Sequence, residues 1–388
     1  MNAQAITSVE MIRRLIGFDT TSRNSNLELI HFVRDYLAGF GVESRLIHDD
    51  SGRKANLYAT IGPDDRPGIA LSGHTDVVPV DGQDWSSDPF VLAQRNGRLY
   101  GRGTADMKSF IAVALALVPE FVARPLKTPI NFAFSYDEEV GCFGVHGIIR
   151  HLRSEGVPPR LTIVGEPSSM RVVNAHKGVR TFNTTVTGLE AHSSATDRGV
   201  NAIFYGARLI AFLEDLAAEF RDRGDTGGRF DLPYTTISVG LANGGTALNI
   251  IPGKCRFFWE CRLLPDHNGD EIIDRFEAYA AETLLPEMQR AYDGASIVTE
   301  QRVMVPGLRP DEGSDAETLV MALAETNQTH AVSYATEAGL FQEADIPTVI
   351  CGPGDIAQAH KPDEFIALEQ VEACEAFLRR LLNRVCAA

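Results

Sequence analysis

The sequence predicts an α/β protein in which a layered domain with a largely parallel sheet is interrupted by a smaller α+β insert. Strand-like apolar runs alternate with segments of helical periodicity over the first part of the chain, as in strands joined by crossover helices. The order changes to β-α-β-β-α from about Val179, as in ferredoxin-like units. The α/β order resumes after Gly294. We therefore expect residues 1–180 and 293–388 to form the main domain and residues 181–292 to form the insert.

Each element of the first segment follows from its apolar spacing and its length. Helices are predicted where apolar residues recur every three to four positions, as Leu27, Ile30 and Val33 do. Short apolar runs bounded by glycine or polar residues predict strands. The long alanine-rich run 107–122 predicts one buried helix. The predicted helices are 8–21, 27–40, 107–122 and 145–153, and the predicted strands are 43–47, 56–61, 68–71, 129–136 and 161–164.

The same patterns assign the rest of the chain. In the insert they predict strands at 180–187, 235–241 and 255–263 and helices at 201–220 and 270–282. After the insert they predict strands at 296–303 and 348–351 and helices at 316–325 and 368–385. In the last helix, Val371, Cys374 and Phe377 lie on or near one face, which indicates a helix packed on a core.

The composition excludes several classes of protein. The chain has 388 residues, 44% hydrophobic and 23% charged, which is ordinary for a globular protein of two to three domains. The net charge of −16 argues against a nucleic-acid partner and against an anionic membrane surface. Six scattered cysteines without a C-x-x-C pair favour neither a disulfide scaffold nor a structural zinc site. With no recognisable signal peptide and no long apolar run, we expect a cytoplasmic protein without a membrane span.

A histidine and two aspartates stand beside predicted elements. His74 follows a strand, and Asp76 lies two residues further on. In an extended chain the two side chains share a side, so Asp76 can accept a hydrogen bond from the second ring nitrogen of His74. Taken alone, this pair is as readily structural as functional. Asp106 follows two glycines at the start of a helix, where it is either an N-cap or a carboxylate able to bridge two cations.

Three further segments carry acidic residues or histidine after apolar strands. Asp137, Glu138 and Glu139 follow a predicted strand directly. Three adjacent carboxylates repel one another unless cations neutralise them, and a solvated turn is the alternative interpretation. Glu166 ends another apolar strand, and His360 lies in a loop after the last predicted strand.

Taken together, these segments predict a metal site. In open α/β sheets, functional groups gather beyond the carboxyl ends of the strands. Histidine combined with carboxylates suits Zn²⁺, and Co²⁺ can substitute for it. The ratio of carboxylates to histidines favours two metal ions with one shared ligand over a single ion held by three histidines.

Five motifs resemble those of the dinuclear zinc amidohydrolases related to aminoacylase, glutamate-releasing carboxypeptidase and succinyl-diaminopimelate desuccinylase. They lie in the family's order between Ser72 and Phe365, and their sequences are SGHTDVVP, GRGTADMK, SYDEEVG, VGEPS and AHKPDEF. GLEAHSS and GGTALNIIP in the insert support the resemblance. It implies that the main domain is a zinc-peptidase-like catalytic domain and that the insert is a dimerisation or lid domain.

The resemblance divides the ligands between two metal ions. It implies that His74 and Glu166 bind one ion, that Glu139 and His360 bind the other, and that Asp106 bridges both. In this family the peptide bond after the bridging aspartate is cis, so the same is expected after Asp106.

The resemblance also implies the catalytic groups. Glu138 would be the general acid/base, taking a proton from the attacking water and passing it to the departing amine. Asp76 would orient His74. His192, in GLEAHSS, would reach the active site of the partner subunit in a homodimer and stabilise the oxyanion. Without the resemblance, a surface turn is the favoured interpretation of His192.

Asn249 and Arg262 are the candidates for substrate recognition. The guanidinium of Arg262 can form a two-point pair with a carboxylate, and Asn249 can donate to the same group. This would suit an N-acyl amino acid as substrate. The alternative for Arg262 is an ion pair with Glu260 on its own strand. The family more often has aspartate at this position, and Glu260 keeps the charge.

Within the family, segments 332–342 and 351–365 look most like those of the acetylornithine deacetylases. This implies hydrolysis of N2-acetyl-L-ornithine to L-ornithine and acetate, a step of arginine biosynthesis. Succinyl-diaminopimelate desuccinylase, acetylcitrulline deacetylase and a broader aminoacylase or dipeptidase would use the same metal machinery and stay open. A binding protein that kept the fold without the chemistry is the alternative from another class. It would lack a ligand or the base, and all of them are present.

Overall fold

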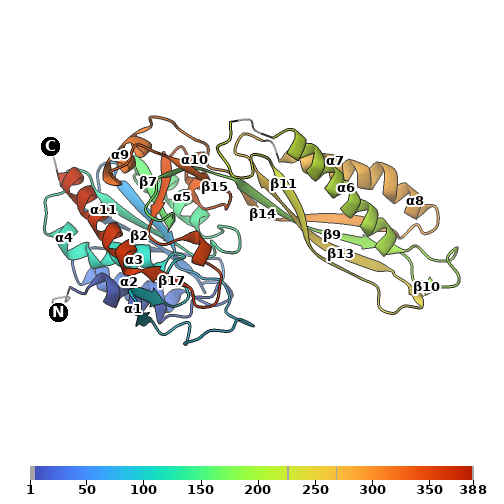
Figure 1. The fold of residues 1–388 in the computed structure, drawn as a ribbon, viewed down its shortest axis with the longest axis horizontal. Helices are drawn as coiled ribbons and strands as arrows, with labels where there is room; N and C mark the ends of the chain where they lie inside the picture. Colours follow the sequence, from blue (N-terminus) through green and yellow to red (C-terminus); the bar gives the residue numbers. More distant parts are fainter. Residues whose placement is uncertain (1–4, 225–226, 268, 387–388) are drawn as a thin grey trace. The chain divides into compact units, whose positions relative to one another are not determined.

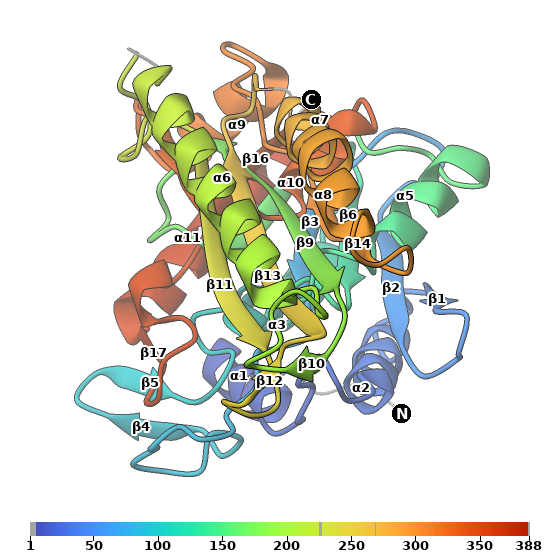
Figure 2. The same cartoon turned by 90° about the vertical axis from the view of Figure 1, so that its right-hand side faces the viewer.

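The computed structural model describes residues 5–224, 227–267 and 269–386, which form two compact units (Figures 1 and 2). The first unit is built from three stretches of the chain, Met1–Ala175, Leu308–Ala331 and Thr336–Ala388. The second unit consists of His176–Gly307 and Val332–Ala335. No helix among the described residues is both long enough and apolar enough to span a membrane.

A mixed eight-stranded sheet forms the centre of the first unit. Its order is β1-β2-β6-β3-β7-β16-β8-β15, and the four neighbours β6, β3, β7 and β16 run parallel. This confirms the predicted α/β class with a largely parallel centre. The strands are β1 Ser44–His48, β2 Ala55–Ile61, β3 Ile69–His74, β6 Ile130–Ser135, β7 Leu161–Pro167, β8 Val173–His176, β15 His330–Val332 and β16 Thr348–Gly352.

Amphipathic helices accompany this sheet. In the first of them, Thr7 caps the N-terminus and a stripe that includes Ile12 and Leu15 is buried. The predicted helix 107–122 is wrong as a single element, because it ends near Leu117, where Pro119 starts a new short helix. The helices of the first unit are α1 Ser8–Ile16, α2 Leu27–Ala38, α3 Lys108–Ala116, α4 Val118–Val122, α5 Val145–Ser154, α9 Asp315–Leu323, α10 Ala338–Glu343 and α11 Leu368–Cys386.

A small three-stranded sheet in the first unit joins distant parts of the chain. Its order is β17-β5-β4, with β4 at Ala93–Arg95, β5 at Arg98–Tyr100 and β17 at Phe365–Ala367. Phe365 pairs with Tyr100. This pairing brings the AHKPDEF motif next to the loop that precedes α3.

The second unit is a ferredoxin-like βαββαβ fold. Its antiparallel sheet has the order β11-β13-β9-β14, and Phe182 stacks on Trp259 in the core, with ring centroids 4.1 Å apart. The elements are β9 Gly178–Thr187, β10 Ala191–His192, α6 Ala202–Asp222, β11 Thr236–Gly244, β12 Ile250–Ile251, β13 Lys254–Leu263, α7 Asp270–Ala278, a π-helix Tyr279–Leu284, α8 Leu285–Gln289 and β14 Ser296–Val305.

The fourth strand of this unit corrects one expected boundary. The insert was expected to end at residue 292, so the strand at 296–303 was assigned to the main domain. In the structure β14 pairs with β9 over its length, and the second unit continues to Gly307. The physical reason is that β9 would otherwise be an unpaired edge with free backbone groups.

Candidate metal centre

Four of the five residues predicted to bind metal, and the predicted base Glu138, come from the carboxyl ends of neighbouring parallel strands, whereas Asp106 lies in the loop before α3. His74 ends β3, and Glu166 lies near the end of β7. Glu138 and Glu139 follow β6, and His360 follows β16. Because parallel strands end at the same edge of a sheet, these side chains gather there.

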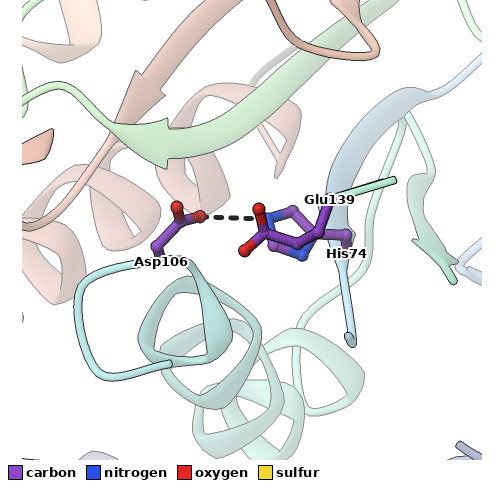
Figure 3. A group of neighbouring side chains, drawn as sticks. All are labelled: His74, Asp106 and Glu139. Carbon is purple, nitrogen blue, oxygen red and sulfur yellow. Dashed lines mark hydrogen bonds and ion pairs between the residues drawn. The ribbon is translucent and has the colours of Figure 1, made fainter. Parts of the chain in front are cut away.

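Asp106 lies between the two histidines. Its Oδ1 is 3.0 Å from Nε2 of His74, and its Oδ2 is 3.3 Å from Nε2 of His360. Each oxygen therefore faces a different ring, which is the arrangement of a carboxylate shared by two sites. Figure 3 shows Asp106 opposite His74 and Glu139. The peptide bond Asp106–Met107 is cis, as the resemblance implied.

On each side of Asp106, a glutamate lies beside a histidine. Oε1 of Glu166 is 3.6 Å from Nε2 of His74, and Oε2 of Glu139 is 3.1 Å from Nε2 of His360. Ligand atoms of His74, Asp106 and Glu139 all lie within 4.8 Å of one another. Ligand atoms of His74, Glu138 and Glu166 also lie within 4.8 Å of one another, so Glu138 lies beside the pair of His74 and Glu166.

Asp76 supports the centre in a way that the sequence predicted only in part. Its backbone oxygen, not its carboxylate, is the nearer partner of His74 Nδ1, at 2.9 Å against 3.6 Å. The carboxylate accepts the backbone N–H groups of Glu138 and Glu139, at 3.1 and 3.3 Å. It also accepts the hydroxyl of Ser22, at 2.6 Å. Asp76 therefore holds both the histidine and the acidic turn.

The pKa values of the residues in the centre are shifted by burial and by the neighbouring carboxylates. Burial raises the pKa of Glu138 and Glu166 well above the usual range of a glutamate, and it raises the pKa of Glu139 to about 7. Hydrogen bonds to Asp106 and Glu139 raise the pKa of His360 to about 10. These shifts mean that the metal-free centre retains protons to offset its crowded carboxylates.

The donor atoms fit divalent metal ions. Oε1 of Glu166 is buried without a hydrogen-bond partner, although a buried carboxylate oxygen normally has one. Imidazole nitrogens and carboxylate oxygens around a shared aspartate match the ligand preferences of Zn²⁺, and Co²⁺ accepts the same ligands.

His192 and Asn249 lie together in the second unit. His192 pairs with Ile250 between β10 and β12, and the backbone N–H of Ser193 donates to the carbonyl of Asn249, at 3.0 Å. The side chain of His192 is exposed, and its Nδ1 is 2.7 Å from the hydroxyl of Ser194. β10 and β12 lie at one end of this unit (Figure 2).

Arg262 lies far from that pair within the same unit. It is near the last residue of β13, whereas Asn249 shortly precedes the first, Lys254. Eight residues of strand separate Lys254 from Arg262, which corresponds to about 26 Å. The guanidinium forms a two-point pair with Glu260, at 3.0 and 3.1 Å, so the alternative contact is present in the structure.

Glu337 is a residue that the sequence analysis missed. It is buried, and its two carboxylate oxygens accept the hydroxyls of Ser72 and Ser135, at 2.5 and 2.8 Å. These serines lie on β3 and β6, next to the residues of the metal centre. It lies in segment 332–342, which supports the family resemblance, but within that segment it is only an acidic residue before a short helix, which is ordinary at helix starts.

Comparison with known proteins decides the family. Residues 70–384 match Peptidase family M20/M25/M40. The chain belongs to this family. It is therefore a metal-dependent hydrolase of amide bonds, and the candidate metal centre lies where the five motifs of this M20 enzyme converge.

Relatives of this M20 enzyme cover nearly its whole length. An acetylornithine deacetylase of Myxococcus xanthus is 36% identical over 381 residues, which cover 97% of this chain and 96% of that protein. An acetylornithine deacetylase of Proteus mirabilis is 34% identical over 397 residues, which cover 100% and 99%.

Solved structures share the fold at lower identity. The aminopeptidase PepT of Bacillus cereus has a TM-score of 0.72 and 21% identity, with both chains fully covered. The M20 metallo-carboxypeptidase Sso-CP2 of Sulfolobus solfataricus has a TM-score of 0.75 and 16% identity, with 98% and 99% covered. A dinuclear metal-binding M20 peptidase of Bacillus subtilis has a TM-score of 0.65 and 18% identity, with 97% of each chain covered.

Proposed function

We propose that this enzyme hydrolyses N2-acetyl-L-ornithine to L-ornithine and acetate, a reaction of arginine biosynthesis. One observation carries the chemistry: Asp106 turns one carboxylate oxygen to each of two histidine-carboxylate groups. Full-length relatives that are named acetylornithine deacetylase support the choice of substrate.

Five side chains would hold two divalent metal ions, Zn²⁺ or Co²⁺. His74 and Glu166 would hold one ion, Glu139 and His360 would hold the other, and Asp106 would be shared by both. When bound, the ions lower the pKa of a water molecule and polarise the carbonyl of the substrate. The unpartnered oxygen of Glu166 and the short contacts of His360 support this division.

Glu138 moves the proton in the proposed mechanism. Its carboxylate takes a proton from the attacking water and gives it to the amine nitrogen as the amide C–N bond breaks. In the metal-free centre, burial raises the pKa of Glu138 well above its usual range, so its carboxylate is a stronger base than that of an exposed glutamate. Asp76, through the backbone N–H of Glu138, keeps this carboxylate in place.

A homodimer would complete the site. His192 would stabilise the oxyanion, and Asn249 and Arg262 would bind the substrate carboxylate. Arg262 lies near one end of β13, and Asn249 and His192 lie near the chain that enters its other end, about 26 Å away along the strand, which favours binding of one small substrate by residues from two protomers. The exposed edge strand β11, where Leu241 is 61% exposed, supports the second unit as the dimerisation or lid domain.

The proposed location is the cytoplasm. All six cysteines are free, and five of them are buried. Unpaired thiols are typical of a reducing compartment.

A substrate panel tests the proposed activity. The purified protein is stripped of metal with a chelator, reloaded with Zn²⁺ or Co²⁺, and assayed with acetylornithine, acetylcitrulline, succinyl-diaminopimelate and acetylmethionine. We expect activity only after metal return and the highest kcat/KM with acetylornithine. A higher kcat/KM with another member of the panel would contradict the proposed substrate, and no hydrolysis of any of them would contradict the proposed function.

A further inference from the structure

Glu364 is fully buried close to the metal centre but belongs to neither ligand group. Its side chain is 0% exposed, that of Arg102 is 1% exposed, and Nη1 of Arg102 lies 2.6 Å from Oε2 of Glu364. Burying two charges costs desolvation energy that their attraction only partly returns, so such a pair is weak evidence of a stabilising role. The other contacts of Glu364 indicate what the pair does.

The second oxygen of Glu364 holds the loop that carries Asp106. Oε1 accepts three backbone N–H groups, from Gly103 at 3.1 Å, Ala105 at 2.8 Å and Asp106 at 3.1 Å. The left-handed φ of Gly103, +87°, helps the loop to turn these groups toward one point. The amide of Asp106 is thus fixed by the carboxylate of Glu364.

Arg102 extends this network to His360. Its Nη2 donates to Oε1 of Gln83 at 2.6 Å, and Nε2 of Gln83 donates to the backbone oxygen of His360 at 2.9 Å. The indole N–H of Trp85 also donates to Oε1 of Gln83, at 3.0 Å. His360 has a left-handed φ of +63°, which is uncommon for a residue with a side chain, and the hydrogen bond from Gln83 to its carbonyl helps to keep it there.

We propose that Glu364 is a positioning residue of the metal centre. Through the loop amides it fixes Asp106, and through Arg102 and Gln83 it fixes His360. Asp106 and His360 both belong to the ligand group that contains Glu139, so the network sets the geometry of that group. The inference rests on the proposed function, because it requires these residues to bind metal ions.

A purely structural role would have a different effect. It would lower the stability of the metal-free protein without changing how the folded protein binds metal. Metal affinity and the visible spectrum of the Co²⁺-loaded protein separate the two roles, because both depend on ligand geometry.

The experiment compares two variants with a matched control. Glu364→Gln removes the charge that holds the loop, and Gln83→Ala removes the link to His360 without burying a lone charge. The control is Glu317→Gln, which changes another buried carboxylate of the first unit. Glu317 accepts the side-chain amide of Asn174 at 2.7 Å and the backbone N–H of Gly313 at 3.3 Å, and neither of these partners is a residue of the metal centre.

Zn²⁺ binding to each folded variant is measured by calorimetry, and the Co²⁺ spectrum is recorded. For Glu364→Gln we expect the Kd of one of the two ions, the one assigned to Glu139 and His360, to rise about tenfold or more, as for other residues that orient ligands. Gln83→Ala should shift the Kd in the same direction by a smaller factor, and both spectra should change. Glu317→Gln should leave the Kd values and the spectrum unchanged.

Two results would overturn the inference. If both test variants bind metal and absorb light as the Glu317→Gln control does, Glu364 does not position the ligands, whereas the proposed function stands. If Glu364→Gln does not fold, Gln83→Ala decides in the same way. A wild-type protein that binds no metal would overturn the proposed function and this inference with it.

Discussion

Glu138 and Glu139 are neighbours in the chain but have different surroundings. Oε2 of Glu139 is 3.1 Å from the imidazole of His360. Glu138 lies with His74 and Glu166, and its Oε1 accepts the thiol of Cys142 at 3.4 Å. Adjacent side chains that point to different partners can serve as ligand and base side by side, because each keeps its own environment.

The Glu138→Gln variant separates these two roles. We expect its kcat to fall by at least ~10²-fold, because the amide cannot accept the proton of the attacking water. Two metal ions should remain, as elemental analysis would measure. Glu139→Gln is the comparison, and it should lose about one equivalent of metal. The opposite pattern would mean that the two glutamates have exchanged roles.

Arg262→Lys tests the proposed contact with the substrate carboxylate. A lysine cannot reproduce the two-point pair, so KM for acetylornithine should rise about tenfold or more. Arg256→Lys is the control on the same strand, where the arginine donates to Asn183 at 2.6 Å. If KM of Arg262→Lys stays close to that of the control, the ion pair with Glu260 is the main role of Arg262.

At the scale of elements, strand β7 can lie close to helix α3 because Gly165 has no side chain. A Cβ at Gly165 would lie 2.0 Å from the ring of Phe110, and Glu166 is the next residue. Backbone and ring can approach this closely only because the strand has no side chain at Gly165. The position of a metal ligand therefore depends on packing one residue away.

Gly165→Ala should destabilise the protein. Overpacking of this kind costs about 1–3 kcal/mol or more, so the melting temperature should fall by several degrees and metal affinity should weaken. Gly240→Ala in β11 is the control, because a Cβ there would meet nothing within 4 Å. A melting temperature of Gly165→Ala equal to that of the control would contradict the packing argument. Calorimetry of both variants measures the difference.

The sequence alone predicts the position of a site residue when that residue directly follows one recognisable strand. His74, Glu166 and Glu138 each follow an apolar strand closely, so their common edge could be predicted from periodicity. The sequence of β14 predicts a strand, but it does not show that this strand pairs with β9. Glu364 and Glu337 could not be assigned, because their partners lie more than 200 residues away in the chain. Contacts of that kind arise only from the tertiary fold.

At the scale of the whole molecule, the metal centre links stability to pH. Folded metal-free protein keeps protons on Glu138, Glu139 and Glu166 that the unfolded chain has already lost, because their pKa values are raised. The raised pKa of His360, about 10, adds stability that is present at low pH and lost as the pH rises through that value. All four shifts make the metal-free protein less stable as the pH rises.

We therefore expect the melting temperature of the metal-free protein to fall between about pH 5.5 and about pH 8.5 relative to the metal-loaded protein. Bound cations take the place of the retained protons, so the loaded protein lacks this loss. Calorimetric scans with and without chelator measure the difference, in which titrating groups elsewhere cancel. Parallel curves over this range would show that the centre does not couple stability to pH.

The order of the ligands along the chain has a consequence for biosynthesis. Four of the five proposed ligands occur by residue 166, and the fifth, His360, follows only after the second unit has been translated. A growing polypeptide therefore presents every ligand of one ion long before it can complete the set for the other. The same delay applies to Glu364, which holds the loop of Asp106. If these five residues are the ligands, the second metal ion can be fully bound only after His360 has been translated.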